Sequence, residues 1–534
     1  MKKGITLVLS VVGIILFLVF QLQAQKNVVM AVPVVKEEVY ESIKESRTPV
    51  QNLTRAELQI GAVTAAREET EQRYYIPKNM DESGFRGELG GLLDGQPVSL
   101  VWKPDSAFDN TDDAVKDRHL FSCMVYSDTE YAELTVLFTG MPVMKIDGDM
   151  GAEGTQISLF DPIFGADGEY RSLQSSAYYN IRGNASKRFE KIGYKLELLE
   201  NDGTTKRKET LLGMRKDDSW QLKALYSDRS KLRDKLSTEL WNNIADLTQT
   251  KADTGCRMEY LELIVNGEYR GLYTLVEPTD YKSLGLDKTK DIIYKVGSDE
   301  RPNDDLFVES EASQSFECGG VHIRQASKTW ESGLWTPFQT FWDNAYELDT
   351  TGSLEMLYSC IDRQNFIDFD LYYNVIAGMD NRFKNIIYST VMNKDGTYVI
   401  RRIPWDQNYS WGDDFEQGED KDIKNIRFNP ELKTKWLNED VFRNMQALDD
   451  TLPADMLRTW KRWRESFLTE ERWKAYAREQ MAYLTDSGAF ARDTEKWPDS
   501  ENVNSTKEIE SYIDARFSWL DKYLTRRQQR CIAL

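Results

Sequence analysis

Two carboxylates and an amide in the second half of the chain have the residue types and the spacing of a phosphoryl-transfer site. Asn385 lies five residues after Asp380 (385 − 380), and Asp406 lies 26 residues after it (406 − 380). A carboxylate can orient and deprotonate an acceptor hydroxyl, and carboxylate and amide oxygens are ligands that Mg²⁺ prefers. Divalent cations neutralise a phosphoryl group in transit, so the three side chains together indicate phosphoryl transfer.

A β-hairpin is needed to bring Asp406 back toward Asp380. Residues 386–391 and 398–400 alternate in polarity around an Asp-Gly pair, which predicts two strands joined by a tight turn. Residues 366–379 predict a helix that leads directly into Asp380. Protein kinases arrange a catalytic Asp, an Asn five residues later and a metal-binding Asp across a hairpin in this same order.

The composition narrows the classes of function. The 534 residues leave room for about two or three domains. Lys and Arg number 68 against 88 Asp and Glu, and the net charge of −20 argues against a nucleic-acid partner. His119 and His322 are the sole histidines, and neither has the spacing of a zinc site. Carboxylates and lysines must therefore carry any chemistry.

The N-terminal residues predict that the rest of the chain is exported from the cytoplasm. Lys2 and Lys3 precede an apolar run from Ile5 to Phe20, and its 16 residues (20 − 5 + 1) are long for a signal-peptide core and slightly short for a spanning helix. Lysines before such a run favour a cytoplasmic N-terminus. We expect residues 1–26 to be an uncleaved signal-anchor, with a cleaved signal peptide as the alternative.

The rest of the chain is expected to form four regions of an α+β protein. Residues 27–86 are charged and free of repeats, and they predict a tether or linker. Short alternating runs in residues 87–137 predict a β-rich accessory region. Residues 138–420 form the main domain, and residues 421–534 predict a helical C-terminal extension.

One helix and a second hairpin are clear within the main domain. Residues 230–244 carry apolar side chains at every fourth position, and Asp228 is placed to cap the helix. Asn266-Gly267 separates two alternating runs, 259–265 and 269–277, and predicts another tight turn.

Several short segments occur in a fixed order along residues 138–420. They are Thr139–Asp147, Arg182–Ser186, Phe189–Leu196, Trp220–Leu222, Asp228–Asp234, Asn266–Glu277, Asp380–Asn385, Pro404–Asp406 and Gly412. Each segment is weak alone, but in this order they resemble the CotH kinase family, atypical kinase-like proteins named for a spore-coat component.

The resemblance implies a protein-kinase-like two-lobed fold, with a β-rich N-lobe that carries one main helix and a helical C-lobe. By the same resemblance Asp380 is the catalytic residue that orients and deprotonates the acceptor hydroxyl. Asn385 and Asp406, with Asn408 two residues further on, are the expected ligands of Mg²⁺.

The resemblance also implies a set of ATP contacts. Arg182-Gly183-Asn184 would replace a glycine-rich phosphate loop, and either Lys191 or Lys195 would reach the α- and β-phosphates. Family matching favours Lys191 and strand geometry favours Lys195, so both stay open. Glu239 is the expected partner of that lysine. The full set of expected ATP-binding residues is Arg182, Gly183, Asn184, Lys191, Lys195, Arg233, Glu239, Glu277 and Lys384.

The sequence departs from the family pattern at several positions. Asn408 stands where a second acid is usual, and an amide oxygen offers a cation less charge. Gly378 and Met379 precede Asp380 in place of the His-Arg of common kinases. The acidic stretch Asp413–Asp422 is expected to be a solvated loop, with a further cation site as the alternative.

We therefore expect a membrane-anchored, extracytoplasmic CotH-like kinase that transfers phosphate from Mg-ATP to Ser or Thr of a surface or coat protein. It would be secreted if the N-terminal segment is cleaved. A non-catalytic cell-surface or spore-coat interaction protein on a degenerate kinase-like fold is the alternative, because ATP is scarce outside the cytoplasm. A third hypothesis keeps the nucleotide site but transfers AMP or another group.

Overall fold

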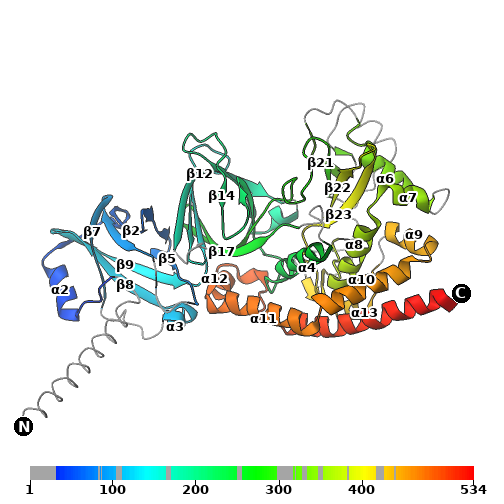
Figure 1. The fold of residues 1–534 in the computed structure, drawn as a ribbon. Coiled ribbons are helices and arrows are strands. Elements are labelled where there is room, and N and C mark those ends of the chain that lie inside the picture. Colours follow the sequence, from blue (N-terminus) through cyan, green and yellow to red (C-terminus); the bar gives the residue numbers. More distant parts are fainter. Residues whose placement is uncertain are drawn as a thin grey trace, which may run out of the picture. The chain divides into compact units, whose positions relative to one another are not determined.

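The structure, a computed structural model, is mixed α+β (Figure 1). Its chain divides into two compact units. Unit 1 comprises Met1–Ala224, Glu259–Leu275 and Ala482–Asp499, and unit 2 comprises Leu225–Met258, Val276–Met481 and Ser500–Leu534. The described residues are 32–81, 85, 87–103, 111–163, 170–183, 185–248, 255–297, 317–318, 320–327, 333–346, 353–381, 384–415, 426–437 and 440–533.

Unit 1 begins with a nine-stranded sheet. Its strands follow the order β3-β2-β6-β7-β8-β9-β5-β4, and β1 pairs with β9. The bounds are β1 Thr48–Pro49, β2 Ala56–Ile60, β3 Val63–Thr64, β4 Ala66–Glu68, β5 Arg73–Pro77, β6 Leu89–Leu93, β7 Gln96–Trp102, β8 Leu120–Tyr126 and β9 Glu130–Thr139, with helices α2 Glu37–Glu45 and α3 Thr111–Lys116.

The predicted tether is wrong for the part of residues 27–86 that the structure describes. Strands β1 to β5 lie in this region, and Ala56, Leu58 and Ile60 alternate into the core of the sheet. The strands are two to five residues long, and some of them pair with strands far away in sequence, such as β5 with β9. Runs this short carry little periodicity, so the sequence alone resembled a charged linker.

A closed seven-stranded barrel forms the second half of unit 1, in the order β10-β11-β12-β13-β16-β18-β17. The bounds are β10 Val143–Asp147, β11 Gln156–Asp161, β12 Arg171–Arg182, β13 Gly193–Leu199, β16 Ser219–Lys223, β17 Met258–Val265 and β18 Glu268–Val276, with a separate pair, β14 Glu209–Thr210 and β15 Lys216–Asp217. Leu196, Trp220 and Leu263 are among the side chains that fill it. Helix α12 (Ala489–Lys496) also belongs to unit 1.

Unit 2 combines a five-stranded sheet with helices. The sheet order is β20-β21-β19-β22-β23. Its elements are α4 Arg233–Thr248, β19 Ile293–Val296, β20 Glu317–Cys318, β21 Val321–Gln325, α6 Thr336–Tyr346, α7 Leu354–Cys360, α8 Arg363–Ile376, β22 Ile386–Met392, β23 Tyr398–Pro404, β24 Asp413–Phe415, β25 Ile426–Phe428, α9 Asp440–Leu448, α10 Leu452–Ser466, α11 Glu470–Asp486, which continues into unit 1, and α13 Lys507–Ala533.

The two predicted hairpins and the two predicted helices of the main domain are confirmed. β22 and β23 pair in antiparallel register from Ile386↔Pro404 to Met392↔Tyr398, and β17 and β18 are neighbours in the barrel. Helices α4 and α8 begin and end within a few residues of the expected bounds. The β-rich and helical parts are present, whereas barrel closure was not expected.

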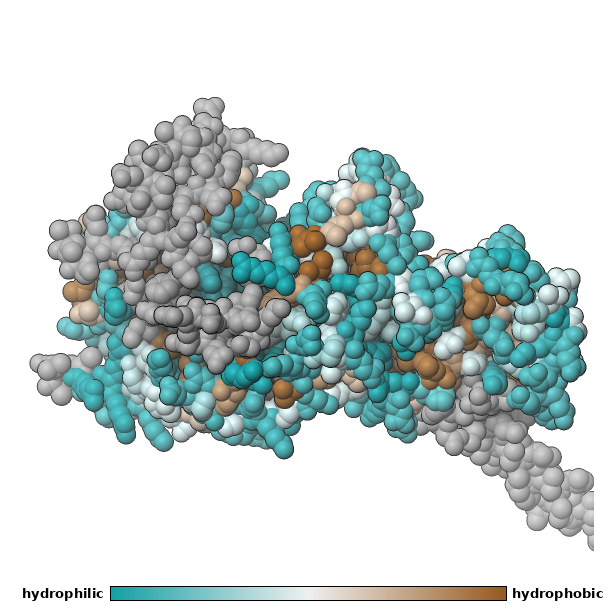
Figure 2. All heavy atoms as spheres, turned by 180° about the vertical axis from the view of Figure 1, so that it is seen from behind, coloured by the Kyte–Doolittle hydropathy of each residue, from teal (hydrophilic) through white to brown (hydrophobic). Residues whose placement is uncertain are grey.

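No helix among the described residues is both long enough and apolar enough to cross a membrane. The predicted signal-anchor at residues 1–26 lies outside the described residues. Hydrophilic side chains dominate the visible surface (Figure 2). The well-exposed large hydrophobic side chains of the described residues are Val39, Leu120, Met150, Tyr178, Ile181, Met356 and Leu448.

Candidate functional site

The turn that carries Asp380 is set by the way α8 ends. Asp362 caps the start of the helix by accepting a hydrogen bond from the N–H of Asn365 at 3.1 Å. At the other end Ala377 adopts a left-handed conformation with φ of 48°, which terminates the helix. The chain then reverses, and Asp380 follows three residues later in a partly buried position.

Asp380 contacts two nearby predicted site residues, Asn385 by a hydrogen bond and Lys384 by an ion pair. The Nδ2 of Asn385 donates to its Oδ2 at 2.8 Å, and the Nζ of Lys384 lies 3.0 Å from its Oδ1. The Asp380 side chain is 16% exposed, so this carboxylate can still be reached from solvent. The bond from Asn385 uses the amide nitrogen and leaves the amide oxygen as an acceptor.

The hairpin of β22 and β23 brings Asp406 to the same region of unit 2. Asn385 directly precedes β22, and its carbonyl accepts from the N–H of Trp405 at 3.1 Å. The side chain of Asn381 donates to the carbonyl of Trp405 at 2.8 Å. Asp406 follows with a left-handed φ of 60°, a conformation that costs a residue with a side chain free energy.

Tyr409 is a buried phenol that follows Asp406 by three residues. Burial raises the pKa of Tyr409 to about 12, and the charges of Asp380 and Asp406 act in the same direction. Its carbonyl accepts from the N–H of Met379 at 3.1 Å. The charges of both acids thus act on the pKa of one buried phenol, although the acids are 26 residues apart in sequence.

Side chains before and at the start of α4 hold the segment that follows Asp406. The N–H of Gln407 donates to Oδ1 of Asp234 at 3.2 Å, and Nδ2 of Asn408 donates to Oγ of Ser227 at 2.8 Å. One turn along α4, Ser237 accepts from the indole N–H of Trp411 at 2.9 Å. We call these contacts the α4 brace.

Arg233 lies in a buried cluster of charges next to the brace. Its guanidinium contacts Asp228 at 3.1 Å and Asp413 at 2.8 Å, and the side chain is 1% exposed. Arg229 contacts Asp413 at 3.0 Å and Glu508 at 2.9 Å. Burial raises the pKa of Asp413, against the opposing effect of the two arginines. Arg233, expected at the phosphates, is thus held by carboxylates in this structure.

Two acids of unit 2 that were predicted to bind ATP, Glu239 and Glu277, accept hydrogen bonds from neighbouring residues. Glu239 accepts a hydrogen bond from the side chain of Asn243, one turn later on α4, at 3.1 Å. Glu277 directly follows β18 and accepts from the N–H of Arg257 at 3.1 Å, and it is 5% exposed. Glu277 therefore lies at the open end of the β17–β18 hairpin, where its side chain links the residue after β18 to the residue before β17.

The expected phosphate loop lies at the end of β12 in unit 1. Arg182 is the last residue of the strand, and Gly183 has φ of 107°. A Cβ at this glycine would collide with the hydroxyl of Ser186, so the turn requires glycine. Asn184 lies outside the described residues.

Lys191 and Lys195 have opposite environments. The Nζ of Lys191 contacts Oδ1 of Asp493 and the carbonyl of Leu272, both at 2.5 Å, and lies 4.8 Å from the ring centre of Tyr273. Its side chain is fully buried. Lys195 projects from β13 with its side chain 57% exposed and pairs with Glu197 at 2.6 Å.

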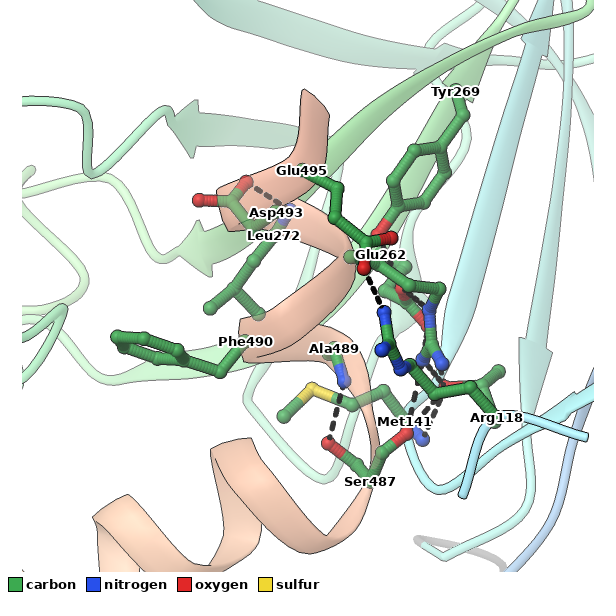
Figure 3. Close-up of polar contacts among 12 residues, drawn as sticks. Arg118, Met141, Glu262, Tyr269, Leu272, Ser487, Ala489, Phe490, Asp493 and Glu495 are labelled. Carbon is green, nitrogen blue, oxygen red and sulfur yellow. Dashed lines mark hydrogen bonds and ion pairs between the residues drawn. The ribbon is translucent and has the colours of Figure 1, made fainter. Parts of the chain in front are cut away.

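Asp493 belongs to α12, and two consecutive charged residues fix this helix to the barrel strands of unit 1. Besides Lys191, Asp493 accepts from the N–H of Leu272 at 2.8 Å (Figure 3). The neighbouring Arg492 forms a double contact with Glu262 on β17, with Nε–Oε1 and Nη2–Oε2 distances of 2.8 Å. The hydroxyl of Tyr269 also donates to Glu262 (Figure 3).

The acidic stretch Asp413–Asp422 is only partly described. Asp413 is paired with arginines, and Asp414 accepts from the side chain of Asn429 at 3.2 Å. Both are buried, so the expectation of a solvated loop is wrong for these two residues. The later acids of the stretch lie outside the described residues.

The donor atoms around Asp380 fit a hard divalent cation. Asp406 supplies a carboxylate, and Asn385 has an amide oxygen that its bond to Asp380 leaves available. Within the described ranges, no group of three or more His, Cys, Asp or Glu side chains is placed to hold a metal ion. Asn385 and Asp406 lie at the two ends of the β22–β23 hairpin, and their role as Mg²⁺ ligands stays a prediction.

Sequence reasoning missed Ser227, Asp234, Tyr409 and Asp493. Tyr409 lies three residues after Asp406 and had no periodic or motif signal of its own. Asp234 was within a matched segment, but its partner Gln407 is 173 residues away in sequence. Asp493 is 302 residues from Lys191. Contacts at such separations are not encoded in local patterns.

Comparison with protein families gives one match. Residues 179–529 match the model described as CotH kinase protein, which is 351 of the 534 residues (529 − 179 + 1). The matched range includes every candidate site residue from Arg182 to Asn408. No protein of the curated collection matches the chain.

Proposed function

The chain belongs to the CotH kinase family, and we propose on that basis that it transfers the γ-phosphoryl group of ATP to a Ser or Thr hydroxyl of a protein. One observation supports this most directly. Asp380 is bonded to Asn385 and Lys384, and the β22–β23 hairpin returns the chain so that Trp405, directly before Asp406, is hydrogen-bonded to Asn385.

The proposed roles follow from this geometry. Asp380 orients the acceptor hydroxyl and takes its proton as the hydroxyl oxygen bonds to the γ-phosphorus. The bond between that phosphorus and its bridging oxygen breaks, and ADP leaves. Mg²⁺, when bound, supplies charge neutralisation for the phosphates. Asn385 fixes Asp380 through its amide nitrogen and offers its oxygen to the cation, while Lys384 adds positive charge beside the base.

A two-lobed kinase-like arrangement is part of the proposal, with the barrel unit as the β-rich lobe. Of the two candidate lysines, the exposed amine of Lys195 suits a phosphate contact better than the enclosed amine of Lys191. Gly183 supports a close backbone approach to phosphate, because its turn excludes a side chain.

The location and the acceptor are also proposed. The two lysines and the apolar run at the N-terminus support a body held outside the cytoplasm on a membrane anchor. A surface or coat protein is then the acceptor that such an enzyme meets. Fold and family do not define which one, since substrate choice depends on surface shape.

The proposal is tested by phosphoryl transfer from radiolabelled ATP. The full chain is incubated with Mg²⁺ and a panel of Ser and Thr peptides, followed by mass spectrometry of the labelled product. We expect transfer of phosphate by the wild type, and at least 100-fold less by Asp380→Asn and by Asp406→Asn, because each removes a charge from the reacting centre. Asp395→Asn, in the exposed hairpin turn, is the matched control and should retain activity.

Equal labelling by the wild type and both site variants contradicts the proposal. Background labelling of every peptide by the wild type and by both site variants also contradicts the proposal. An AMP adduct in the mass spectrum instead of a phosphate supports transfer of another group from the same nucleotide site.

A second function, as a non-catalytic surface or coat interaction protein, is favoured by Asn408. This amide stands in place of an acid and is hydrogen-bonded to Ser227. Thermal unfolding with millimolar Mg-ATP separates the two functions, because a ligand that binds the folded state raises the melting temperature. A rise in melting temperature supports the kinase, and an unchanged value supports the interaction protein.

A further inference from the structure

A groove runs along one side of α13 (Figure 1). Its lining includes Lys507, Glu510, Asp514, Ala515, Trp519 and Lys522 of this helix. Thr434, at the end of the 3-10 helix η6 (Pro430–Thr434), lines it as well. The groove has a volume of about 740 Å³, a size typical of ligand sites. Both elements belong to unit 2, so the groove is formed within a single unit.

The apolar part of the groove is the indole of Trp519, which is held in place by stacking. Its ring stacks on Tyr523 with 4.7 Å between the ring centres, and Tyr523 stacks on Trp436 at 4.8 Å. The guanidinium of Arg516 lies 5.1 Å from the ring centre of Trp519. Trp519 is partly exposed, and the small side chain of Ala515 lies one turn earlier in the lining. This fixed indole can therefore receive an apolar or aromatic side chain at little cost in conformational entropy.

The two acids of the groove are neutralised by bases of helix α11. Glu510 pairs with Arg478 at 2.8 Å, and Asp514 pairs with Lys474 at 2.7 Å. The acids that flank the lining in sequence are paired as well, Glu508 with Arg229 and Asp521 with Arg464. These carboxylates therefore leave little negative charge to repel an anion from the groove.

Two lysines of the groove, Lys507 and Lys522, have exposed side chains and no acidic partner among the described residues. Lys433 adds a positive charge, since its amine donates to the hydroxyl of Ser511 in the lining at 2.8 Å. The charged lining residues and the charged groups in contact with the lining sum to +4 (+6 − 2): Lys433, Lys474, Arg478, Lys507, Arg516 and Lys522 against Glu510 and Asp514. The whole chain has a net charge of −20, so the groove is a positive site on an acidic protein.

The spacing of Lys507 and Lys522 sets the length of a matching ligand. They are 15 residues apart (522 − 507), which is about 22 Å along the helix. An extended peptide covers this distance in roughly seven residues. The ammonium groups of the two lysines bind single carboxylates, whereas Arg478, whose planar fork suits phosphate or sulfate, is committed to Glu510. The groove therefore favours an acidic peptide over a phosphorylated or sulfated polymer.

We propose that this groove docks an extended acidic segment of the acceptor protein. Carboxylates roughly seven residues apart meet Lys507 and Lys522, and an apolar or aromatic side chain between them packs on Trp519. The identity of the partner as the acceptor rests on the proposed function. Docking itself requires neither ATP nor a cation, so it can be measured without phosphoryl transfer.

The test is fluorescence anisotropy of labelled peptides titrated with the full chain. The acidic probe has two Glu at each end of a six-residue centre of Pro, Ala and Tyr, and the neutral probe has Gln in place of each Glu. We expect the acidic probe to bind at least tenfold more tightly than the neutral probe, although the net charge of the protein opposes this. Added salt should weaken the binding, because the two lysines are exposed.

Two variants change the charge and the shape of the groove separately. Lys507→Glu/Lys522→Glu reverses both charges and should weaken binding of the acidic probe at least tenfold. Ala515→Phe fills the space beside Trp519 without a change of charge and should weaken binding at least tenfold as well. Circular dichroism confirms that each variant is folded.

Lys288→Glu/Lys394→Glu is the matched control. It makes the same change of charge at two exposed lysines outside the lining, and the affinity for the acidic probe should stay within about twofold of the wild type. Attaching the acidic segment to a phosphorylated acceptor peptide should lower KM at least tenfold with kcat unchanged, and Lys507→Glu/Lys522→Glu should cancel this gain.

Equal affinity for the acidic and neutral probes overturns the inference, as does a loss in the control equal to that in Lys507→Glu/Lys522→Glu. Undiminished binding by a folded Ala515→Phe variant also overturns it. Binding of polygalacturonate without binding of the acidic probe assigns the groove to a polysaccharide and overturns the peptide. An unchanged KM overturns the assignment to the acceptor.

The binding measurement is independent of catalysis. Tight binding of the acidic probe without phosphate transfer to any peptide supports the docking groove and contradicts the proposed function. Active transfer with equal affinity for both probes does the reverse.

Discussion

The carboxylate of Asp234 accepts a hydrogen bond from the main-chain N–H of Gln407, with 3.2 Å between Oδ1 and N. The donor belongs to the residue directly after Asp406, so a side chain in the first turn of α4 fixes the backbone of the proposed cation ligand. Ser227 and Ser237 hold Asn408 and Trp411 in the same segment. The left-handed backbone at Asp406 needs such support, because it is costly by itself.

Replacing Asp234 is expected to weaken catalysis without direct contact with substrate. Asp234→Leu removes an acceptor worth roughly 1.5–3 kcal/mol for a charged group, and we expect kcat to fall about tenfold or more. The Mg²⁺ concentration for half-maximal rate should rise as well, because Asp406 is no longer held in place. Kinetics over a Mg²⁺ series check this.

Asp234→Asn is the conservative control, since its amide oxygen can still accept from Gln407. It should retain most of the rate. A folded Asp234→Leu variant with wild-type kcat and an unchanged Mg²⁺ requirement shows that the contact does not position Asp406.

Breaking the buried pair of Lys191 and Asp493 is expected to destabilise unit 1 strongly. Lys191→Met leaves the Asp493 carboxylate buried without its cation, which costs about 3–5 kcal/mol of unfolding free energy. Urea unfolding measures the loss. The double variant Lys191→Met/Asp493→Leu should recover part of it, because no uncompensated charge remains.

Lys195→Met is the matched control for stability, because this lysine is exposed and its pair with Glu197 contributes about 0–1 kcal/mol. A loss for Lys191→Met no larger than that for Lys195→Met means that the buried pair is not a principal stabilising contact.

The same variants are expected to separate the two lysines by their effect on ATP. Lys195→Met should raise KM for ATP about tenfold, since a charged contact with phosphate is lost. The double variant at Lys191 and Asp493 should leave KM within about twofold, because the Lys191 amine is enclosed by protein groups. Initial rates over an ATP series distinguish the outcomes, and the reverse order assigns the contact to Lys191.

Asp449 is expected to make stability sensitive to acid. Burial works against its charge, but hydrogen bonds from Thr451, Tyr358 and Arg363 prevail and lower its pKa from 3.8 to about 2. A lowered folded-state pKa adds stability above about pH 4, and this stability is lost as the pH falls toward 2. The shift corresponds to about 2 kcal/mol.

Unfolding by urea between pH 5 and pH 2.5 tests the role of Asp449. The Asp449→Asn variant should be less stable than the wild type at pH 5, and the difference should shrink as the pH falls. The exposed neighbour Asp450, changed to Asn, is the control and should show a constant difference from the wild type. A constant difference for Asp449→Asn as well contradicts the assignment.

Local signals explain which parts of the fold the sequence predicted. The Asp-Gly and Asn-Gly turns determined both hairpins, and the hairpin of β22 and β23 in turn placed Trp405, directly before Asp406, against Asn385. Helix α8 was recognisable because its pattern ends just before Asp380. These features depend on residues within about 30 positions of one another, where turn chemistry and periodicity act.

Long-range pairing explains what the sequence did not predict. The sequence predicts a tether where the structure has β5, because β5 pairs with β9 and the paired residues Arg73 and Thr135 are 62 positions apart (135 − 73). No local pattern reveals such a pairing. The partner of Lys191 could not be inferred from the kinase pattern, which pointed to Glu239 on α4. Instead, Glu239 bonds to Asn243, and the acid that meets Lys191 comes from α12.

The position of α12 in the chain has a consequence for biosynthesis. The segment Ala482–Asp499 belongs to unit 1, and its first residue follows the end of the last barrel strand, Val276, by 206 residues (482 − 276). Until this segment has been made, Lys191 and Glu262 lack the charges that compensate them in the finished protein. Burying these two charged side chains earlier would be strongly unfavourable, so we expect the barrel to stay loosely packed until α12 has been made. We therefore expect final packing of the barrel to follow synthesis of α12, long after the barrel strands themselves have been made.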